Sequence, residues 1–186
     1  MTASPANPGR LIAVVGPSGA GKDTLLAGAL ALRPELELVR RVITRPAGAG
    51  GEAHEAVGLP EFEARCALGH FVVHWQAHGL SYGIPRNALG RVRAGATVLF
   101  NGSRAALPQA RAAFPRLEVV MVTAPVPVLA TRLAARGRES AAAIAARLER
   151  SLLAPPAGAR VVVNDGTVAE GVARLLAALS LSEARA

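Results

Sequence analysis

A glycine-rich segment, Gly16–Lys22 (GPSGAGK), constrains this chain more than any other part of its sequence. It follows a short apolar run with β-branched residues, Leu11–Val15, and precedes helix-forming residues from Asp23 to Leu32. Glycines let backbone N–H groups turn inward around an anion, the next helix directs its positive end to the same point, and the lysine reaches the outer phosphates. A buried parallel strand, a triphosphate-binding loop and a helix are therefore predicted in that order. The residues predicted to bind the triphosphate are Gly16, Pro17, Ser18, Gly19, Ala20, Gly21, Lys22, Asp23 and Thr24.

Lys22 is the one lysine among the 21 lysines and arginines of the chain. Such a preference for arginine is typical of GC-rich coding sequences, which makes the exception informative. A compact ammonium suits a phosphate oxygen in a tight loop, whereas a planar guanidinium does not fit there. The retained lysine supports a catalytic role for Lys22.

The residue after Lys22 departs from the usual loop, which has Ser or Thr at that position to bind Mg²⁺. Here Asp23 stands there and Thr24 follows. Hard cations favour oxygen ligands, so both side chains are candidate Mg²⁺ ligands. The alternative for Asp23 is an acidic residue that the helix dipole stabilises in the first turn. The sequence favours neither alternative over the other.

Strands and helices alternate along the chain, which predicts an α/β fold with a parallel sheet. The predicted strands are 11–15, 38–43, 71–75, 97–100, 117–123 and 160–163. The predicted helices are 23–32, 60–69, 85–94, 105–114, 127–136, 140–153 and 168–179. The glycine-rich stretch from Thr44 to Leu59 is predicted to be a loop. A length of 186 residues fits a single domain over residues 10–180, with tails at 1–9 and 181–186.

The net charge of +8 is spread along the chain and aromatic residues make up only 3%, so we expect anionic small molecules as partners and no nucleic acid. No apolar run has the length of a bilayer span, and residues 1–9 lack the features of a signal peptide, so we expect no membrane segment. The single cysteine, Cys66, fits a reducing cytoplasm. The sequence does not indicate an oligomeric state.

From about Arg10 to Leu179 the order of motifs resembles the guanylate kinase group of P-loop kinases. The motifs are GPSGAGKDTL, Ile43–Pro46 (ITRP), His74–Gly83 (HWQAHGLSYG) and Val163–Gly166 (VNDG). This resemblance implies a central parallel sheet flanked by helices. It also implies a small acceptor-binding insertion at about 44–84 and a helical, arginine-rich lid at about 132–150.

Two departures concern the base of the acceptor. Guanylate kinases hold the guanine edge with carboxylates, because that edge presents two donors. This chain has Gln76 and Asn101-Gly102-Ser103 at those positions. An amide complements two donors less well than a carboxylate. These departures weaken the case for recognition of guanine.

The chain is more similar to the ribose 1,5-bisphosphate phosphokinase family of phosphonate catabolism, which shares the aspartate after the loop lysine. The shared segments are GPSGAGKD, ITR, Gly51–His54, WQAHGLSYG, Asn101–Ala105, Arg136–Glu139 and NDG. The similarity implies transfer of a phosphoryl group from ATP to ribose 1,5-bisphosphate, with Mg²⁺. The products would be 5-phosphoribosyl 1-diphosphate (PRPP) and ADP.

The same resemblance implies roles for further residues. Lys22, Arg136 and Arg147 would be catalytic, and Arg132 and Asn164 would contact ATP. The acceptor would be bound by Arg45, Gln76, His78, Tyr82, Asn101, Ser103 and Arg104.

The predicted nucleophile, an oxygen of a phosphate monoester, is already largely dianionic and needs no general base. This agrees with a chain that contains only two aspartates, Asp23 and Asp165. One alternative is a guanylate kinase or another nucleoside monophosphate kinase. An alternative of another class is a non-catalytic, guanylate-kinase-like binding module, which predicts a degenerate phosphate loop.

Overall fold

The computed structural model describes residues 9–48, 52–135 and 154–180. The chain divides into two compact units: unit 1 comprises residues 1–13 and 34–118, and unit 2 comprises 14–33 and 119–186. The domain boundaries expected from the sequence remain a prediction. The expected helix at 140–153 lies outside the described residues.

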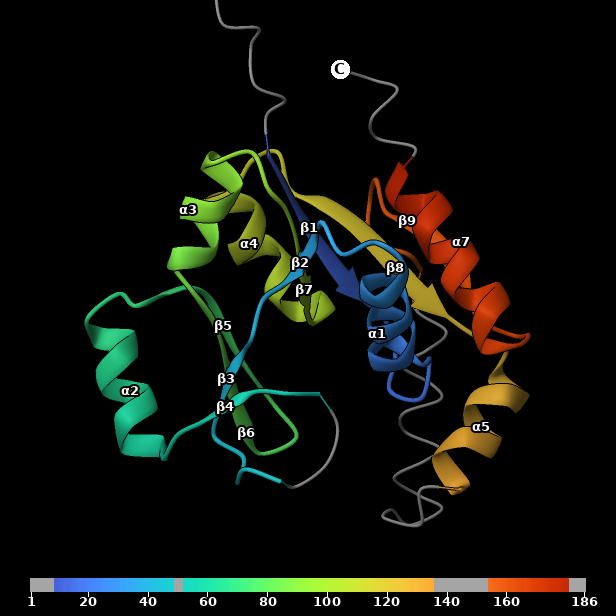
Figure 1. Ribbon diagram of the computed structural model, residues 1–186. Helices are drawn as coiled ribbons and strands as arrows, with labels where there is room; N and C mark the ends of the chain where they lie inside the picture. Colours follow the sequence, from blue (N-terminus) through green and yellow to red (C-terminus); the bar gives the residue numbers. More distant parts are fainter. Residues whose placement is uncertain (1–8, 49–51, 136–153, 181–186) are drawn as a thin grey trace, which may run out of the picture. The chain divides into compact units, whose positions relative to one another are not determined.

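Five strands form one sheet in the order β2-β7-β1-β8-β9. Their bounds are Arg10–Val15 (β1), Leu36–Leu38 (β2), Thr97–Asn101 (β7), Glu118–Thr123 (β8) and Arg160–Val163 (β9). β2 pairs in parallel with β7, and β8 pairs in parallel with β9. Leu11 to Val15 are all buried, as expected for a strand that is covered on both faces. These strands confirm the predicted α/β fold with a parallel sheet (Figure 1).

In unit 2 the phosphate loop leads into α1, Lys22–Leu32, which packs against α7, Val168–Ser180 (Figure 1). A Cβ atom at Gly28 would lie 2.5 Å from Cγ2 of Val172, so the two helices approach closely because residue 28 has no side chain. α7 begins with a capping box. Thr167 Oγ1 accepts from the N–H of Glu170, and the N–H of Thr167 donates to Glu170 Oε2 at 2.8 Å. The remaining helix of unit 2 with described residues is α5, Val126–Ala134.

Unit 1 contains a second sheet in the order β4-β3-β6-β5. Its strands are Val42–Ile43 (β3), Glu55–Ala56 (β4), Phe71–Ala77 (β5) and Leu80–Pro85 (β6). β6 is antiparallel to both β3 and β5, whereas β3 and β4 are parallel. His78 (φ 54°) and Gly79 (φ 72°) form the turn between β5 and β6, and two successive positive φ angles are typical of a two-residue hairpin loop.

Helix α2, Leu59–Ala67, packs on this second sheet (Figure 1). The ring of Phe62 stacks on that of Phe71, with centroids 4.8 Å apart, and Val42 completes the cluster. Unit 1 also contains three helical segments: α3 (Asn87–Arg93), the 3₁₀ turn η1 (Arg104–Ala106) and α4 (Leu107–Ala113).

Two predictions of secondary structure in unit 1 are wrong, and one strand was not predicted. The expected strand at 38–43 is two short strands, β2 and β3, which belong to different sheets. The expected loop at 44–59 contains β4. Residues 80–85 form β6, so the helix expected from residue 85 begins at Asn87. The hydrogen-bond partners of these short strands are distant in sequence, and periodicity within a short window does not reveal them.

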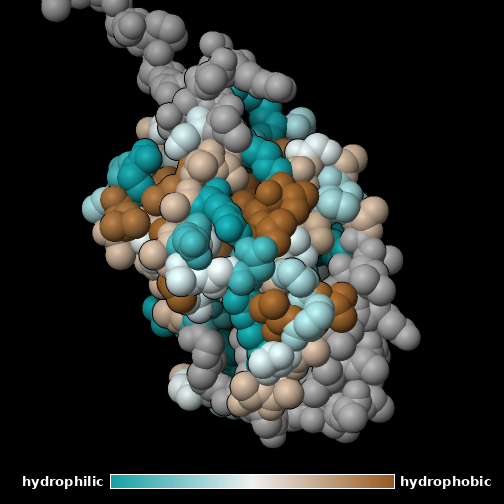
Figure 2. Space-filling model, turned by 90° about the vertical axis from the view of Figure 1, so that its right-hand side faces the viewer, coloured by the Kyte–Doolittle hydropathy of each residue, from teal (hydrophilic) through white to brown (hydrophobic). Residues whose placement is uncertain are grey.

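In the part of the chain that the structure describes, no helix is long and apolar enough to cross a membrane. On the face seen in Figure 2, hydrophobic side chains form small patches separated by hydrophilic ones.

Candidate active site

The loop between β1 and α1 has a backbone that only glycine adopts readily. Gly16, Gly19 and Gly21 have φ angles of 147°, 86° and 87°. A Cβ at Gly16 would lie 1.9 Å from the carbonyl oxygen of Val122, and one at Gly21 would lie 2.5 Å from Asn164 Nδ2. A larger residue at either position would be strained by the positive φ angle and would collide with a neighbouring atom.

The ammonium of Lys22 lies over the loop that precedes it. Its Nζ donates to the carbonyl oxygens of Gly16 at 2.8 Å and Pro17 at 3.0 Å. Gly21 occupies the N-cap position of α1, so the residue at this position has no side chain to cap the first turn. N–H groups at a helix start, together with an adjacent ammonium, form a binding site for phosphate.

Asn164 holds the loop through a hydrogen bond, and Arg132 holds Asn164 in turn. The buried amide of Asn164 donates from Nδ2 to the carbonyl oxygen of Ala20 at 2.8 Å. Arg132 Nη1 donates to the carbonyl oxygen of Asn164 at 3.0 Å. Asn164 therefore positions the loop backbone and Arg132 positions Asn164, and the ATP contacts expected for both residues remain predictions.

Asp23 and Thr24 lie in the first turn of α1, and both are exposed. Their oxygen atoms are thus at the N-terminal end of α1, next to the glycine loop. Arg136, Arg147 and the expected lid from residue 136 onward lie outside the described residues.

Unit 1 contains a pocket of about 840 Å³ between the β5–β6 hairpin and the segments that follow β3 and β4. Three of the residues expected to bind the acceptor, Arg45, Gln76 and His78, line it. Thr44 and Ser81 lie in its wall and hold β3 to β6, since Thr44 Oγ1 accepts from the N–H of Ser81 at 2.8 Å. The volume suits a small-molecule ligand.

A second group of polar residues in unit 1 is organised by Glu52. Its Oε1 accepts from Arg41 Nε, and its Oε2 accepts from Asn101 Nδ2 at 2.8 Å. The side chains of Arg41 and Glu52 are only 11% and 10% exposed. We call Arg41, Glu52 and Asn101 the Glu52 cluster.

Tyr82 lies next to the Glu52 cluster. Its ring stacks on Trp75, with centroids 5.2 Å apart and planes 6° from parallel. The guanidinium of Arg41 lies 5.1 Å from the Tyr82 centroid and 5.8 Å from that of Trp75, which is cation–π geometry. Asn101 and Tyr82 are therefore connected through Glu52 and Arg41.

Ser103 and Arg104 have a local structural role at the start of η1. Ser103 Oγ accepts from the N–H of Ala105 at 3.3 Å and so caps this turn. Neither residue lines the pocket. Their predicted contacts with the acceptor remain predictions.

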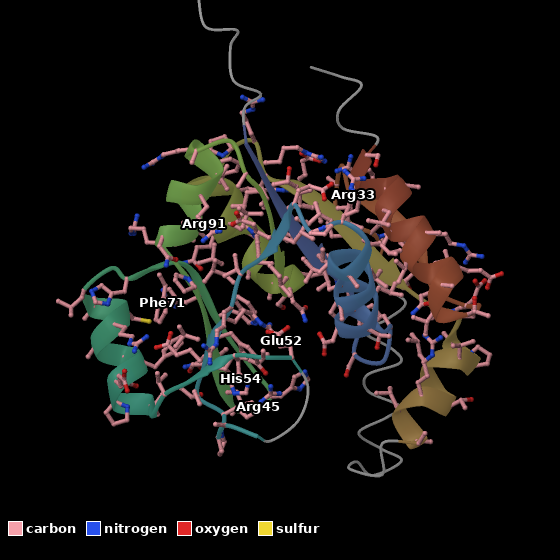
Figure 3. All side chains as sticks on the ribbon, viewed as in Figure 1. Arg33, Arg45, Glu52, His54, Phe71 and Arg91 are labelled. Atoms are coloured by element: carbon pink, nitrogen blue, oxygen red, sulfur yellow. The ribbon has the colours of Figure 1, made fainter. Side chains whose placement is uncertain are left out.

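Reasoning from the sequence missed Glu52, His54 and Arg41 as candidate site residues. His54 contacts Arg45 through both ring nitrogens, and Figure 3 shows Arg45, Glu52 and His54 side by side. The available signal for Glu52 and His54 was the charged and polar stretch Glu52–Glu55 (EAHE), which follows the glycine-rich segment after the Thr44-Arg45-Pro46 motif.

The remaining reactive groups are less suited to catalysis. Partial burial, with a smaller contribution from Glu63, raises the pKa of the Cys66 thiol, which disfavours the thiolate. A hydrogen bond from Arg174, at 2.6 Å, lowers the pKa of Asp165, so this carboxylate is paired in an exposed ion pair.

The sheet, the glycine loop and the loop lysine define a P-loop kinase of the guanylate-kinase-like fold. A guanylate kinase from Anaplasma phagocytophilum superposes with a TM-score of 0.69, covering 95% of this chain and 87% of that chain at 21% identity. No protein-family model matches the chain.

Relatives at higher identity identify the family. A protein of Ruegeria sp. named ribose 1,5-bisphosphate phosphokinase PhnN is 48% identical over 185 residues, which are 97% of this chain and 96% of the relative. A protein of the same name from Agrobacterium fabrum is 54% identical, covering 77% of this chain and 80% of the relative. The chain belongs to the ribose 1,5-bisphosphate phosphokinase family.

Some relatives are longer. A bifunctional ribose 1,5-bisphosphokinase-thymidine phosphorylase from Azorhizobium caulinodans is 51% identical over 92% of this chain, but the match covers 26% of that protein. A ribose 1,5-bisphosphate phosphokinase PhnN from Laribacter hongkongensis is 52% identical, and the match covers 43% of it. The chain therefore spans less than half the length of these two relatives.

Proposed function

We propose that this protein transfers the γ-phosphoryl group of ATP to the C1 phosphate of ribose 1,5-bisphosphate, which yields PRPP and ADP. Family membership carries this proposal, because relatives named for this kinase match nearly all of the chain. The intact phosphate loop supports a catalytic protein and disfavours a non-catalytic binding module.

The glycine loop and Lys22 bind the triphosphate. Backbone N–H groups of the loop and of the first turn of α1 donate to phosphate oxygens, and the ammonium neutralises charge on the outer phosphates. Lys22 is held in place by two loop carbonyl oxygens, so it is oriented before ATP arrives. A preoriented charge stabilises the transition state without reorganisation.

The acceptor binds in the pocket of unit 1, where Arg45, Gln76 and His78 meet a phosphorylated sugar. The attacking group is a phosphate oxygen that is already ionised, so no residue has to remove a proton. Glu61, a carboxylate in the pocket wall, forms an ion pair with Arg65 at 2.6 Å. This site therefore acts by positioning the substrates and by neutralising their charge.

The Glu52 cluster supports a sugar phosphate over GMP as acceptor. Guanine presents donors and calls for a carboxylate with free lone pairs. Both oxygens of Glu52 already accept from Arg41 and Asn101. Gln76, the side chain at the position of a guanine-binding glutamate, is an amide.

Asp23 and Thr24 fit a divalent cation, because both are exposed oxygen donors in the first turn of α1. Bound Mg²⁺ would neutralise charge on the β- and γ-phosphates. These two residues would hold it directly or through water.

Replacement of Asp23 by alanine, which has no oxygen ligand, tests the metal role. Loss of one negative ligand should raise the Mg²⁺ concentration at half-maximal activity by about tenfold, while kcat at saturating Mg²⁺ changes less. A titration of activity with MgCl₂ at fixed ATP measures this. An unchanged Mg²⁺ requirement would leave Asp23 as a residue that stabilises only the helix start.

A comparison of acceptors tests the proposed function. Purified protein with ATP and Mg²⁺ should release ADP with ribose 1,5-bisphosphate and at most weakly with GMP. ³¹P NMR of the product should show two coupled phosphorus signals of a C1 diphosphate and an unchanged C5 monoester. Strong turnover with GMP alone would refute the proposal in favour of a nucleoside monophosphate kinase.

A further inference from the structure

His54 lies in unit 1, directly before β4, and its backbone is held on both sides. The N–H of the next residue, Glu55, donates to the carbonyl oxygen of Arg41 at 2.8 Å as β4 pairs with β3. Arg40 Nη2 donates to the carbonyl oxygen of His54 at 3.1 Å. This places the imidazole next to Arg45, which follows β3 (Figure 3).

The imidazole makes three contacts through its two nitrogens. Nδ1 lies 3.1 Å from Arg45 Nη2 and 3.1 Å from the carbonyl oxygen of Glu52, while Nε2 lies 3.2 Å from the carbonyl oxygen of Arg45. The guanidinium can only donate, so Nδ1 must carry a lone pair to accept from it. The carbonyl oxygen of Arg45 requires a proton on Nε2. The neutral Nε2–H tautomer is thus the form that makes both contacts with Arg45. In this tautomer Nδ1 has no proton for the carbonyl oxygen of Glu52, so that third approach is not a hydrogen bond.

One N–H group of the Arg45 side chain lacks a hydrogen-bond acceptor among the described residues. This N–H group is that of Nε, which is enclosed. A buried donor without an acceptor is costly, and a bound oxygen anion removes that cost. The same residue lines the 840 Å³ pocket together with Thr44, Gln76 and Ser81. His54 therefore holds one edge of the guanidinium while another N–H remains available.

We propose that His54 is a positioning residue for the acceptor. In its neutral Nε2–H tautomer it fixes both the backbone and the guanidinium of Arg45, so that Arg45 presents its remaining N–H groups to a phosphate of the sugar bisphosphate. This inference rests on the proposed function. Arg45 would contact the substrate, whereas His54 acts through Arg45.

An alternative role for His54 is to stabilise the loop between β3 and β4 without any effect on substrate. The two roles differ in the ring nitrogen on which they depend: Nδ1 contacts the guanidinium of Arg45, and Nε2 contacts its backbone. An asparagine side chain places its oxygen near the position of Nδ1, where it can accept from Arg45 Nη2. A glutamine side chain reaches the position of Nε2 and can donate to the carbonyl oxygen of Arg45. Phenylalanine preserves the volume and removes both contacts.

The test compares His54→Asn, His54→Gln and His54→Phe in steady-state assays of the full chain with ATP and ribose 1,5-bisphosphate. We expect His54→Phe to raise the KM for the sugar bisphosphate by about tenfold or more, since a hydrogen bond to a charged group is lost. His54→Asn should stay within about threefold of the wild type because it restores the acceptor for Arg45. The KM for ATP should be unchanged in all three. His70→Phe, at an exposed histidine outside the pocket, is the matched control.

Two results would overturn the inference. One is a His54→Phe variant with a wild-type KM for the sugar bisphosphate. The other is rescue by glutamine but not by asparagine, which would assign the effect to the backbone contact. Thermal unfolding of each variant shows whether it is folded, and the Asn–Gln comparison remains decisive even if phenylalanine is not tolerated. Failure of the wild type to use ribose 1,5-bisphosphate would instead refute the proposed function.

Discussion

Replacement of Lys22 by methionine should lower kcat by about 1,000-fold or more, with any acceptor. Methionine preserves the length of the side chain but removes the charge that neutralises the outer phosphates in the transition state. The carbonyl oxygens of Gly16 and Pro17 lose their partner, but Lys22 is only partly buried, so water can replace the ammonium there. The protein should therefore remain folded, and ADP release in a coupled assay measures the loss.

The lone lysine also permits a direct binding test. An amine-reactive reagent can modify only one lysine side chain in this chain, and ATP should protect it. The Lys22→Met variant serves as the control, because any remaining label then marks the N-terminal amine. A Lys22→Met variant that retains more than about a tenth of the wild-type kcat would remove the loop lysine from the mechanism.

Replacement of Glu52 by glutamine should reduce the free energy of unfolding by about 3 kcal/mol, because Arg41 would keep a buried charge without its counter-ion. Glutamine has nearly the shape of glutamate, but its amide nitrogen must face Arg41 or Asn101, and both of these donate. For a chain of this length the melting temperature should fall by about 6–12 °C. Urea unfolding followed by circular dichroism measures the effect.

A double-mutant cycle distinguishes a lost ion pair from general damage. Removal of Arg41 as well, in an Arg41→Met/Glu52→Gln variant, should recover at least about half of the lost stability, since no unpaired charge is left. Strictly additive losses, or a Glu52→Gln variant as stable as the wild type, would contradict the role assigned to the Glu52 cluster.

The first strand, the glycine loop and α1 were predictable because each depends on local sequence. The strand is indicated by a continuous apolar run, the loop by glycines at positions of positive φ, and the helix by a stretch of helix formers. The strand expected at 38–43 was wrong for the opposite reason. Leu36–Leu38 pairs with β7, whereas Val42 and Ile43 pair with β6, and both partners are distant in sequence.

The acceptor side was predictable only in part. Arg45, Gln76 and His78 were singled out through a family resemblance, and the structure places all three around one pocket. Glu52 and His54 belong to a segment shared with the family, but no role for either followed from that segment, because its residue types do not form a motif with its own chemistry. Their contacts with Asn101 and Arg45 arise from the packing of a glycine-rich loop against β3 and β7.

The sequence by itself determined that this chain has a triphosphate loop with a single lysine, an α/β fold and a set of motifs shared with one kinase family. These features follow from local backbone preferences and from the periodicity of apolar residues. Only the tertiary structure decided how two arginines of unit 1, Arg41 and Arg45, are held. Arg41 is held by the carboxylate of Glu52, and Arg45 by the imidazole of His54. A guanidinium at low exposure requires fixed acceptors, and which residues supply them depends on chain segments that meet only after folding.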